Sequence, residues 1–187
     1  IVVSPGVPIN RHPIADKAKS ARIPLLGDIE LFAMARANLP PHRVIGITGT
    51  NGKSTTTALV HHLLKSSALP TRMGGNIGLP ILSQLPLPAG GVYVLELSSY
   101  QIDITHSLAC DAAALINLSP DHLDRYASYE AYISSKARLF SMQTAKQHSI
   151  FGSGDCDTAR VYREVLERRE SQFVHLVDPE LISGQSE

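Results

Sequence analysis

The sequence predicts an α/β protein in which a mostly parallel sheet carries helices on both faces and binds a nucleotide. Short, continuously apolar runs alternate with helical patterns, as in chains that form a buried parallel sheet. In the segment Val44–Thr57, VIGITGTNGKSTTT, a glycine-rich turn with Lys53 and Ser54 joins a predicted strand to a predicted helix. Ligands of such sheets gather at the carboxyl ends of the strands, so we expect the site at that edge.

Composition narrows the class of protein. The 187 residues are 43% hydrophobic, which is enough for a sizeable core, and 17 basic residues balance 17 acidic ones. This balance disfavours nucleic acids and anionic membranes as partners, and no apolar run approaches the roughly 20 residues that span a bilayer. Cys110 and Cys156 lack metal-ligand spacing, which indicates a reducing, intracellular compartment. The start at Ile1 resembles neither a signal peptide nor a translation start, as expected of a fragment.

A small unit is predicted ahead of the glycine-rich segment. After a turn at Ser4-Pro5-Gly6, the pair Pro40-Pro41 is the next clear interruption, and we interpret it as a linker. Residues 1–39 are then the end of an N-terminal domain, and residues 40–187 form a nucleotide-binding domain whose C-terminal part is truncated. The elements predicted in the first unit are a strand end at Ile1–Val3, a helix at Arg11–Ser20, an extended piece at Ile23–Leu26 and a helix from an N-cap at Asp28 to Ala37.

Strands and helices alternate through the larger unit. Apolar runs predict strands at Val44–Thr48, Thr71–Met73, Val92–Leu97, Ala112–Leu118, Ser149–Phe151 and Phe173–Leu176. Helical patterns predict helices at Ser54–Leu64, Ser128–Ser141 and Thr158–Arg169.

The glycine-rich turn has the residue types that a phosphate-binding loop needs. The amides at the helix N-terminus bind phosphate, Lys53 can reach the outer phosphates, and the Ser54 hydroxyl can ligate magnesium. A strict Walker A spacing would need glycine where Ile47 stands. The alternative is an ordinary turn between strand and helix, but Gly-Lys-Ser at this junction favours phosphate binding.

Polar side chains follow two further predicted strands. Glu96 and Ser98 lie at the end of one, and His122 follows the next. Since the carboxyl ends of parallel strands meet at one edge, Glu96 and His122 are candidate ligands of a second magnesium ion, although imidazole is unusual for so hard a cation. The alternatives are a carboxylate satisfied by backbone amides and a structural or solvated histidine.

Two other positions are ambiguous in the sequence alone. The loop GGNIG would let a substrate approach the backbone closely and offers the Asn76 amide, but composition alone slightly favours a plain turn. Lys136 lies within a predicted helix, where a lysine is ordinarily a solvated charge.

Taken together, these motifs resemble the Mur ligase family, ATP-dependent enzymes that add amino acids to the peptide of the peptidoglycan precursor. GTNGKST at 49–55 is similar to the ATP loop of the family. GGNIG at 74–78 and LELSSYQID at 95–103 resemble the member that adds D-glutamate to UDP-N-acetylmuramoyl-L-alanine. SPGVP at 4–8 and GDIELF at 27–32 are similar to the end of its first domain, and the resemblance is evident to about Phe151.

The resemblance implies roles for particular residues. Lys53, His122 and Lys136 would be catalytic, and Lys136 matches a lysine that the family carbamylates, which requires a neutral amine and therefore burial in the site. The implied ATP-binding residues are Gly49, Thr50, Asn51, Gly52, Lys53, Ser54 and Thr55. The implied metal ligands are Ser54, Glu96, His122 and Lys136, and the implied substrate contacts are Ser4, Gly6, Asn76 and Ser98.

The resemblance to the Mur ligase family also implies a fold and a reaction. The fold is the central domain of the family, preceded by a remnant of an N-terminal Rossmann-like domain. ATP, with magnesium at two sites, would convert the terminal carboxylate of UDP-N-acetylmuramoyl-L-alanine into an acyl phosphate, which the amine of D-glutamate attacks. The implied setting is peptidoglycan synthesis, and with it cell shape and division, by a cytoplasmic monomer without nucleic-acid or membrane partners.

Two other functions remain open at this stage. In the family, an N-terminal domain holds uracil and a C-terminal domain holds D-glutamate, so we expect this chain alone to be inactive. One alternative is another Mur ligase or a folylpolyglutamate synthase-like ligase. The other is a nucleotide-binding module without catalysis.

Overall fold

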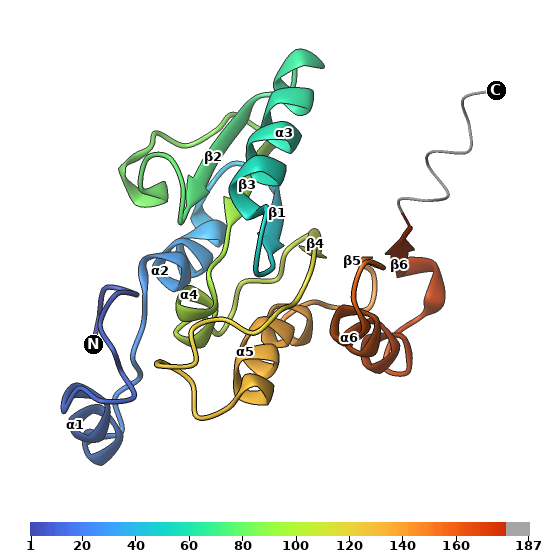
Figure 1. The fold of residues 1–187 in the computed structure, drawn as a ribbon. Helices are drawn as coiled ribbons and strands as arrows, with labels where there is room; N and C mark the ends of the chain where they lie inside the picture. Colours follow the sequence, from blue (N-terminus) through green and yellow to red (C-terminus); the bar gives the residue numbers. More distant parts are fainter. Residues whose placement is uncertain (179–187) are drawn as a thin grey trace.

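A six-stranded parallel sheet organises the chain in the computed structural model, which describes residues 1–178 (Figure 1). The strand order is β2-β3-β1-β4-β5-β6, and every ladder is parallel. The strands are β1 His42–Thr48, β2 Thr71–Gly75, β3 Gly91–Glu96, β4 Ala112–Leu115, β5 His148–Gly152 and β6 Val174–Val177. The predicted α/β class with a parallel sheet is confirmed.

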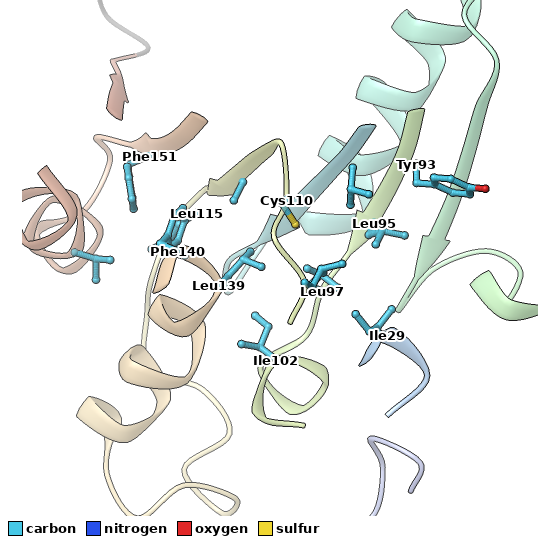
Figure 2. Close-up of a cluster of buried hydrophobic side chains, with 14 of the residues drawn as sticks. Ile29, Tyr93, Leu95, Leu97, Ile102, Cys110, Leu115, Leu139, Phe140 and Phe151 are labelled. Atoms are coloured by element: carbon cyan, nitrogen blue, oxygen red, sulfur yellow. The ribbon is translucent and has the colours of Figure 1, made fainter. Parts of the chain in front are cut away.

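Helices cover both faces of the sheet. They are α1 Ile14–Ala21, α2 Asp28–Ala35, α3 Lys53–Ser66, α4 Ser99–Asp103, α5 Tyr129–Ser141 and α6 Cys156–Leu166, with 3-10 turns at Arg36–Asn38, Ile81–Ser83 and Ser171–Phe173. On one face, Val60 and Leu64 of α3 pack against Ile47, Val92 and Val94. The other face holds the larger core, to which α2, α4 and α5 contribute Ile29, Ile102, Leu139 and Phe140 (Figure 2).

The central strand brings the predicted site together. β1 lies between β3 and β4, with Ile47 paired to Glu96 and Thr48 paired to Leu115. The segments that leave the carboxyl ends of these strands therefore meet at one edge of the sheet, as the sequence predicts.

Several element boundaries differ from the predictions. β4 ends at Leu115 rather than at residue 118, because the following residues leave the sheet: Asn117 O accepts a hydrogen bond from Thr50 N at 3.0 Å. The N-cap of α2 is Gly27 rather than Asp28, since Gly27 is extended and donates its N–H to Ile104 O. The strand expected at Ile1–Val3 is reduced to a single bridge between Val2 and Leu26.

Further differences occur at the helices. α6 begins earlier than predicted because the Asp155 side chain accepts a hydrogen bond from Thr158 N and caps it, and it ends at Leu166. The sequence patterns did not predict α4. It is fixed by a capping box, in which Ser98 Oγ accepts from Gln101 N and Gln101 Oε1 accepts from Ser98 N.

The segment before Pro40 packs on the same core as the sheet. Ile29 and Phe32 of α2 are 1% and 3% exposed within the larger core. Between them, the buried Glu30 carboxylate accepts hydrogen bonds from His106 N and from Ser107 N and Oγ. The end of the first predicted unit therefore packs against the core of the sheet. The predicted domain boundary after residue 39 stays a prediction.

Candidate functional site

The loop predicted to bind phosphate, residues 49–55 (called the phosphate loop below), begins where β1 ends and runs into α3. Gly52, with φ 78° and ψ 0°, is the N-cap of α3, in a left-handed conformation that glycine adopts without steric cost. No side chain caps this helix. Its first N–H groups are therefore available to an anion, which the positive end of the helix dipole also attracts.

Hydrogen bonds from the segment after β4, from α5 and from within the loop hold the phosphate loop in place. Asn117 Oδ1 accepts from Thr50 N at 3.2 Å and from Asn51 N at 2.9 Å, and Asn117 Nδ2 donates to Asn51 O at 3.0 Å. Thr50 Oγ1 exchanges hydrogen bonds with the Ser119 backbone and lies 3.1 Å from the Tyr132 hydroxyl. Lys53 Nζ donates to Thr50 O at 2.8 Å. The loop is thus already shaped before a ligand binds.

Lys136 lies beneath the phosphate loop. It is 2% exposed, its Nζ donates to Gly49 O at 2.8 Å, and it lies 4.7 Å from the centre of the Tyr132 ring. Burial, followed by the nearby charge of Lys53, lowers the pKa of Lys136 from 10.5 to about 7. The solvated-charge alternative is therefore wrong, and a substantial share of this amine is neutral near pH 7.

Glu96 combines burial with an unused oxygen. Its side chain is 1% exposed, and Oε1 accepts from Asn76 Nδ2 at 3.0 Å. Oε2 is buried and has no hydrogen-bond partner within residues 1–178. The Asn76 backbone N–H also donates to Glu96 O at 2.9 Å, so the GGNIG loop and β3 are tied together. A buried carboxylate oxygen that lacks a partner suits a hard cation such as Mg²⁺.

His122 lies in a more open position. It is exposed, with φ 53°, and its Nε2 lies 3.5 Å from Asp121 Oδ2. Its ring lies 5.1 Å from that of Tyr100 and 6.1 Å from that of Tyr132. In the described part of the chain, no three His, Cys, Asp or Glu side chains converge to hold a metal ion. A Mg²⁺ ion here would therefore need phosphate and hydroxyl oxygens as well, which is its usual manner of binding.

The two candidate serines differ in availability. Ser54 is exposed in the first turn of α3, beside Lys53. Ser98 Oγ is used in the α4 capping box, where it accepts from Gln101 N and donates to Gln101 Oε1, both at 3.2 Å. Ser54 is thus the freer hydroxyl for a metal ion.

A cleft of about 590 Å³ lies between the N-terminal segment and residues 123–127. Ser4 lines it, together with Tyr100 and Asp103 from the start and end of α4. Gly6 N donates to Ser4 Oγ at 3.4 Å, so the two residues form one turn at the cleft. Of the candidate substrate residues, Ser4 lines this cleft and Asn76 does not.

Sequence reasoning missed two residues that shape the site. Asn117 lies within the predicted strand Ala112–Leu118, and nothing in the sequence indicates that its side-chain amide would bind residues 50 and 51. Tyr132 precedes Lys136 by four residues on a helix, so the two share one face, and this spacing was the available signal.

Replacing Tyr132 with phenylalanine is expected to weaken binding of Mg-ATP roughly five-fold, because about 1 kcal/mol is lost with one hydrogen bond to Thr50. Tyr129→Phe is the matched control, since it removes a hydroxyl on the same helix that donates to Asp157 Oδ2 at 3.0 Å. Titration calorimetry with Mg-ADP or Mg-ATP measures the nucleotide affinity of both variants. Equal affinities for the two variants would show that the Tyr132 hydroxyl does not order the loop.

Residues 47–178 match the family described as the Mur ligase middle domain. This match extends beyond Phe151, the residue to about which the motifs make the resemblance evident. The chain is 67% identical over 187 residues to the UDP-N-acetylmuramoylalanine–D-glutamate ligase of Novosphingobium aromaticivorans, and 52% identical over 190 aligned positions to the ligase of that name from Zymomonas mobilis. Both alignments cover 100% of this chain and 42% of the relative.

Solved structures share the fold at low sequence identity. A UDP-N-acetylmuramoyl-L-alanyl-D-glutamate–2,6-diaminopimelate ligase aligns with a TM-score of 0.61 and 20% identity, covering 95% of this chain and 44% of the other. MurF ligase from Thermotoga maritima, solved with ADP, aligns with a TM-score of 0.59 and 19% identity, covering 81% and 35%. Among the helices of residues 1–178, none has the length and apolar character to cross a membrane.

Proposed function

Because this chain belongs to the Mur ligase family, we propose that it comes from an ATP-dependent, ADP-forming ligase that adds D-glutamate to UDP-N-acetylmuramoyl-L-alanine. The names of relatives up to 67% identical over the whole chain support this choice of substrates. The chain spans 42% of the length of these relatives, so the activity belongs to the longer protein. The single observation that carries the proposal is the uncapped start of α3 beside Lys53, with Lys136 buried beneath the same loop.

In this proposal the phosphate loop, residues 49–55, binds ATP. The N–H groups of the first α3 turn hold the phosphates, and Lys53 exchanges its bond to Thr50 O for the γ-phosphate. Transfer of the γ-phosphoryl group to the substrate carboxylate gives an acyl phosphate and ADP, and the amine of D-glutamate then displaces phosphate. The positive charge of Lys53 stabilises the transferring group, since positioning and electrostatics dominate such reactions.

Magnesium and a modified lysine complete the proposed site. Bound Mg²⁺ would neutralise charge on the phosphates. Ser54 is proposed as its protein ligand at one position, and the free oxygen of Glu96, with His122 and Lys136, at a second. We propose that the neutral amine of Lys136 adds carbon dioxide and loses a proton, which gives a carbamate that can act as a ligand. Its lowered pKa supports this step.

We assign the remaining candidate residues to the UDP-linked substrate: Ser4 and Gly6 to its diphosphate, and Asn76 and Ser98 to its muramoyl part. Residues 1–39 would end the N-terminal domain, and residues 40–187 would belong to the central ATP-binding domain. A cytoplasmic, monomeric enzyme of peptidoglycan synthesis, acting on small molecules, is the setting that we propose.

The deciding experiment measures phosphate release from Mg-ATP in the presence of UDP-N-acetylmuramoyl-L-alanine. The full-length protein and residues 1–187 are each assayed with D-glutamate, L-glutamate and other amino acids. We expect release that depends on D-glutamate in the full-length protein and none from residues 1–187, which span less than half of the relatives.

Other results of the phosphate-release assay would indicate other functions. Preference for a different amino acid would identify another ligase of the same superfamily, such as a folylpolyglutamate synthase. Binding of ATP without release under any condition would leave a nucleotide-binding module.

A further inference from the structure

Arg125 joins the two sides of the cleft. Its guanidinium donates to three consecutive backbone carbonyls of the N-terminal segment, Pro5 O at 3.4 Å, Gly6 O at 3.2 Å and Val7 O at 3.2 Å. Among the described residues it forms no salt bridge. The guanidinium of arginine spreads five N–H donors over a planar fork, whereas the three donors of a lysine ammonium share one nitrogen.

Side chains of the N-terminal segment also donate hydrogen bonds to the backbone of residues 124–125. Asn10 Nδ2 donates to Arg125 O at 2.5 Å, and the Arg11 guanidinium donates to Asp124 O. Segments more than 110 residues apart in the chain are therefore joined from both sides. We call this set of contacts, between residues 5–11 and residues 124–125, the clasp.

The same arginine also touches the side of the cleft that carries His122. Its guanidinium lies 4.1 Å from the centre of the Tyr100 ring, in a cation–π arrangement. The Tyr100 ring in turn lies 5.1 Å from that of His122. The Arg125 backbone N–H donates to His122 O at 2.9 Å, so residues 122–125 form one turn. A shift of Arg125 would consequently move both the turn at Ser4 and the His122 loop.

We propose that Arg125 is a positioning residue that fixes residues 4–7 against the His122 loop, so that a substrate held in the cleft is presented to the phosphate loop. The inference rests on the proposed function, because it concerns how the UDP-linked substrate is aligned. Among the described residues, Arg125 makes no direct contact with residues 49–55, so we expect the larger effect on the substrate side.

The test is steady-state kinetics of the full-length enzyme with Arg125→Ala, Arg125→Lys and Asn10→Ala. For Arg125→Ala we expect KM for UDP-N-acetylmuramoyl-L-alanine to rise and kcat to fall, each about ten-fold or more, because several hydrogen bonds are lost together. The Kd of Mg-ATP should change less than about two-fold, within the scatter for uncoupled sites. Asn10→Ala breaks the clasp from the other side and should give the same pattern, more weakly. Arg163→Ala is the control, since that exposed guanidinium donates within its own helix, to Ala159 O.

The results separate positioning from other roles. Arg125→Lys should recover little, because the three donors of an ammonium share one nitrogen and cannot reproduce the spread of Nη1 and Nη2 across three carbonyls. Full recovery with lysine would overturn the proposal in favour of a simple charge contact with the substrate. Parallel losses of ATP binding and of thermal stability in the alanine variants would overturn the proposal in favour of a general structural role. Unchanged KM and kcat in these variants would also overturn it. Absence of D-glutamate-dependent turnover in the unmodified enzyme would instead refute the proposed function.

Discussion

Replacing Lys53 with alanine in the full-length protein is expected to lower kcat/KM for Mg-ATP about 10³-fold or more, as removal of a preorganised cation from a phosphoryl-transfer site commonly does. The cause is the loss of the one cationic side chain of the loop itself, whose Nζ now donates to Thr50 O at 2.8 Å. Phosphate release at varied Mg-ATP measures the loss.

Lys65→Ala provides the matched control. Lys65 is exposed and lies in the last turn of the same helix, far from its N-terminus. It should leave kcat/KM unchanged within about two-fold, as surface substitutions away from a site do. Retention of activity by Lys53→Ala would exclude the phosphate loop as the catalytic site.

Replacing Lys136 with arginine is expected to lower D-glutamate-dependent turnover about 10²-fold or more, because arginine keeps the positive charge and cannot supply a neutral amine. Removal of carbon dioxide should slow the unmodified enzyme reversibly and leave the residual rate of the variant unchanged. The control is the exposed Lys17→Arg on α1. Full turnover in Lys136→Arg would indicate a purely cationic role for this side chain and contradict the carbamate.

The lowered pKa of Lys136 also has an effect on stability. Below pH 7 both the folded and the unfolded chain hold this proton, and the full penalty of a buried charge applies. Between the folded pKa of about 7 and the ordinary value of 10.5 the unfolded chain holds more protons, so the free energy of unfolding rises with pH in this window. Lys136→Met should lose that rise. Urea unfolding at about pH 6 and pH 9 measures the difference, and equal pH dependence in both proteins would place the pKa of Lys136 outside the window.

The sequence predicted the sheet, its principal helices and the phosphate loop, because each depends on local periodicity or on a turn motif. It missed α4, which at five residues is too short to show a helical period. It also left Lys136 ambiguous, since the burial of a helical lysine is decided by what packs over it. Only the fold places Gly49 O at its amine.

Contacts to the backbone were beyond prediction for a different reason. Arg125 reaches the carbonyls of residues 5–7, and any residue type offers such an acceptor, so no pattern in the sequence marks the pair. The bond between Asn76 and Glu96 likewise follows from the parallel pairing of Gly75 with Glu96, which no local pattern specifies.

The three hydrogen bonds between the Asn117 side chain and residues 50–51 bear on the thermodynamics of nucleotide binding. A flexible loop that closes around phosphate loses backbone entropy in the complex, at about 1 kcal/mol or more for each residue that becomes fixed. Here that ordering has already occurred during folding of the sheet. In the proposed complex with ATP, the interaction energy of the phosphates with α3 would therefore be retained largely as affinity. Asn117, in the segment that follows β4, would set how much of it is retained.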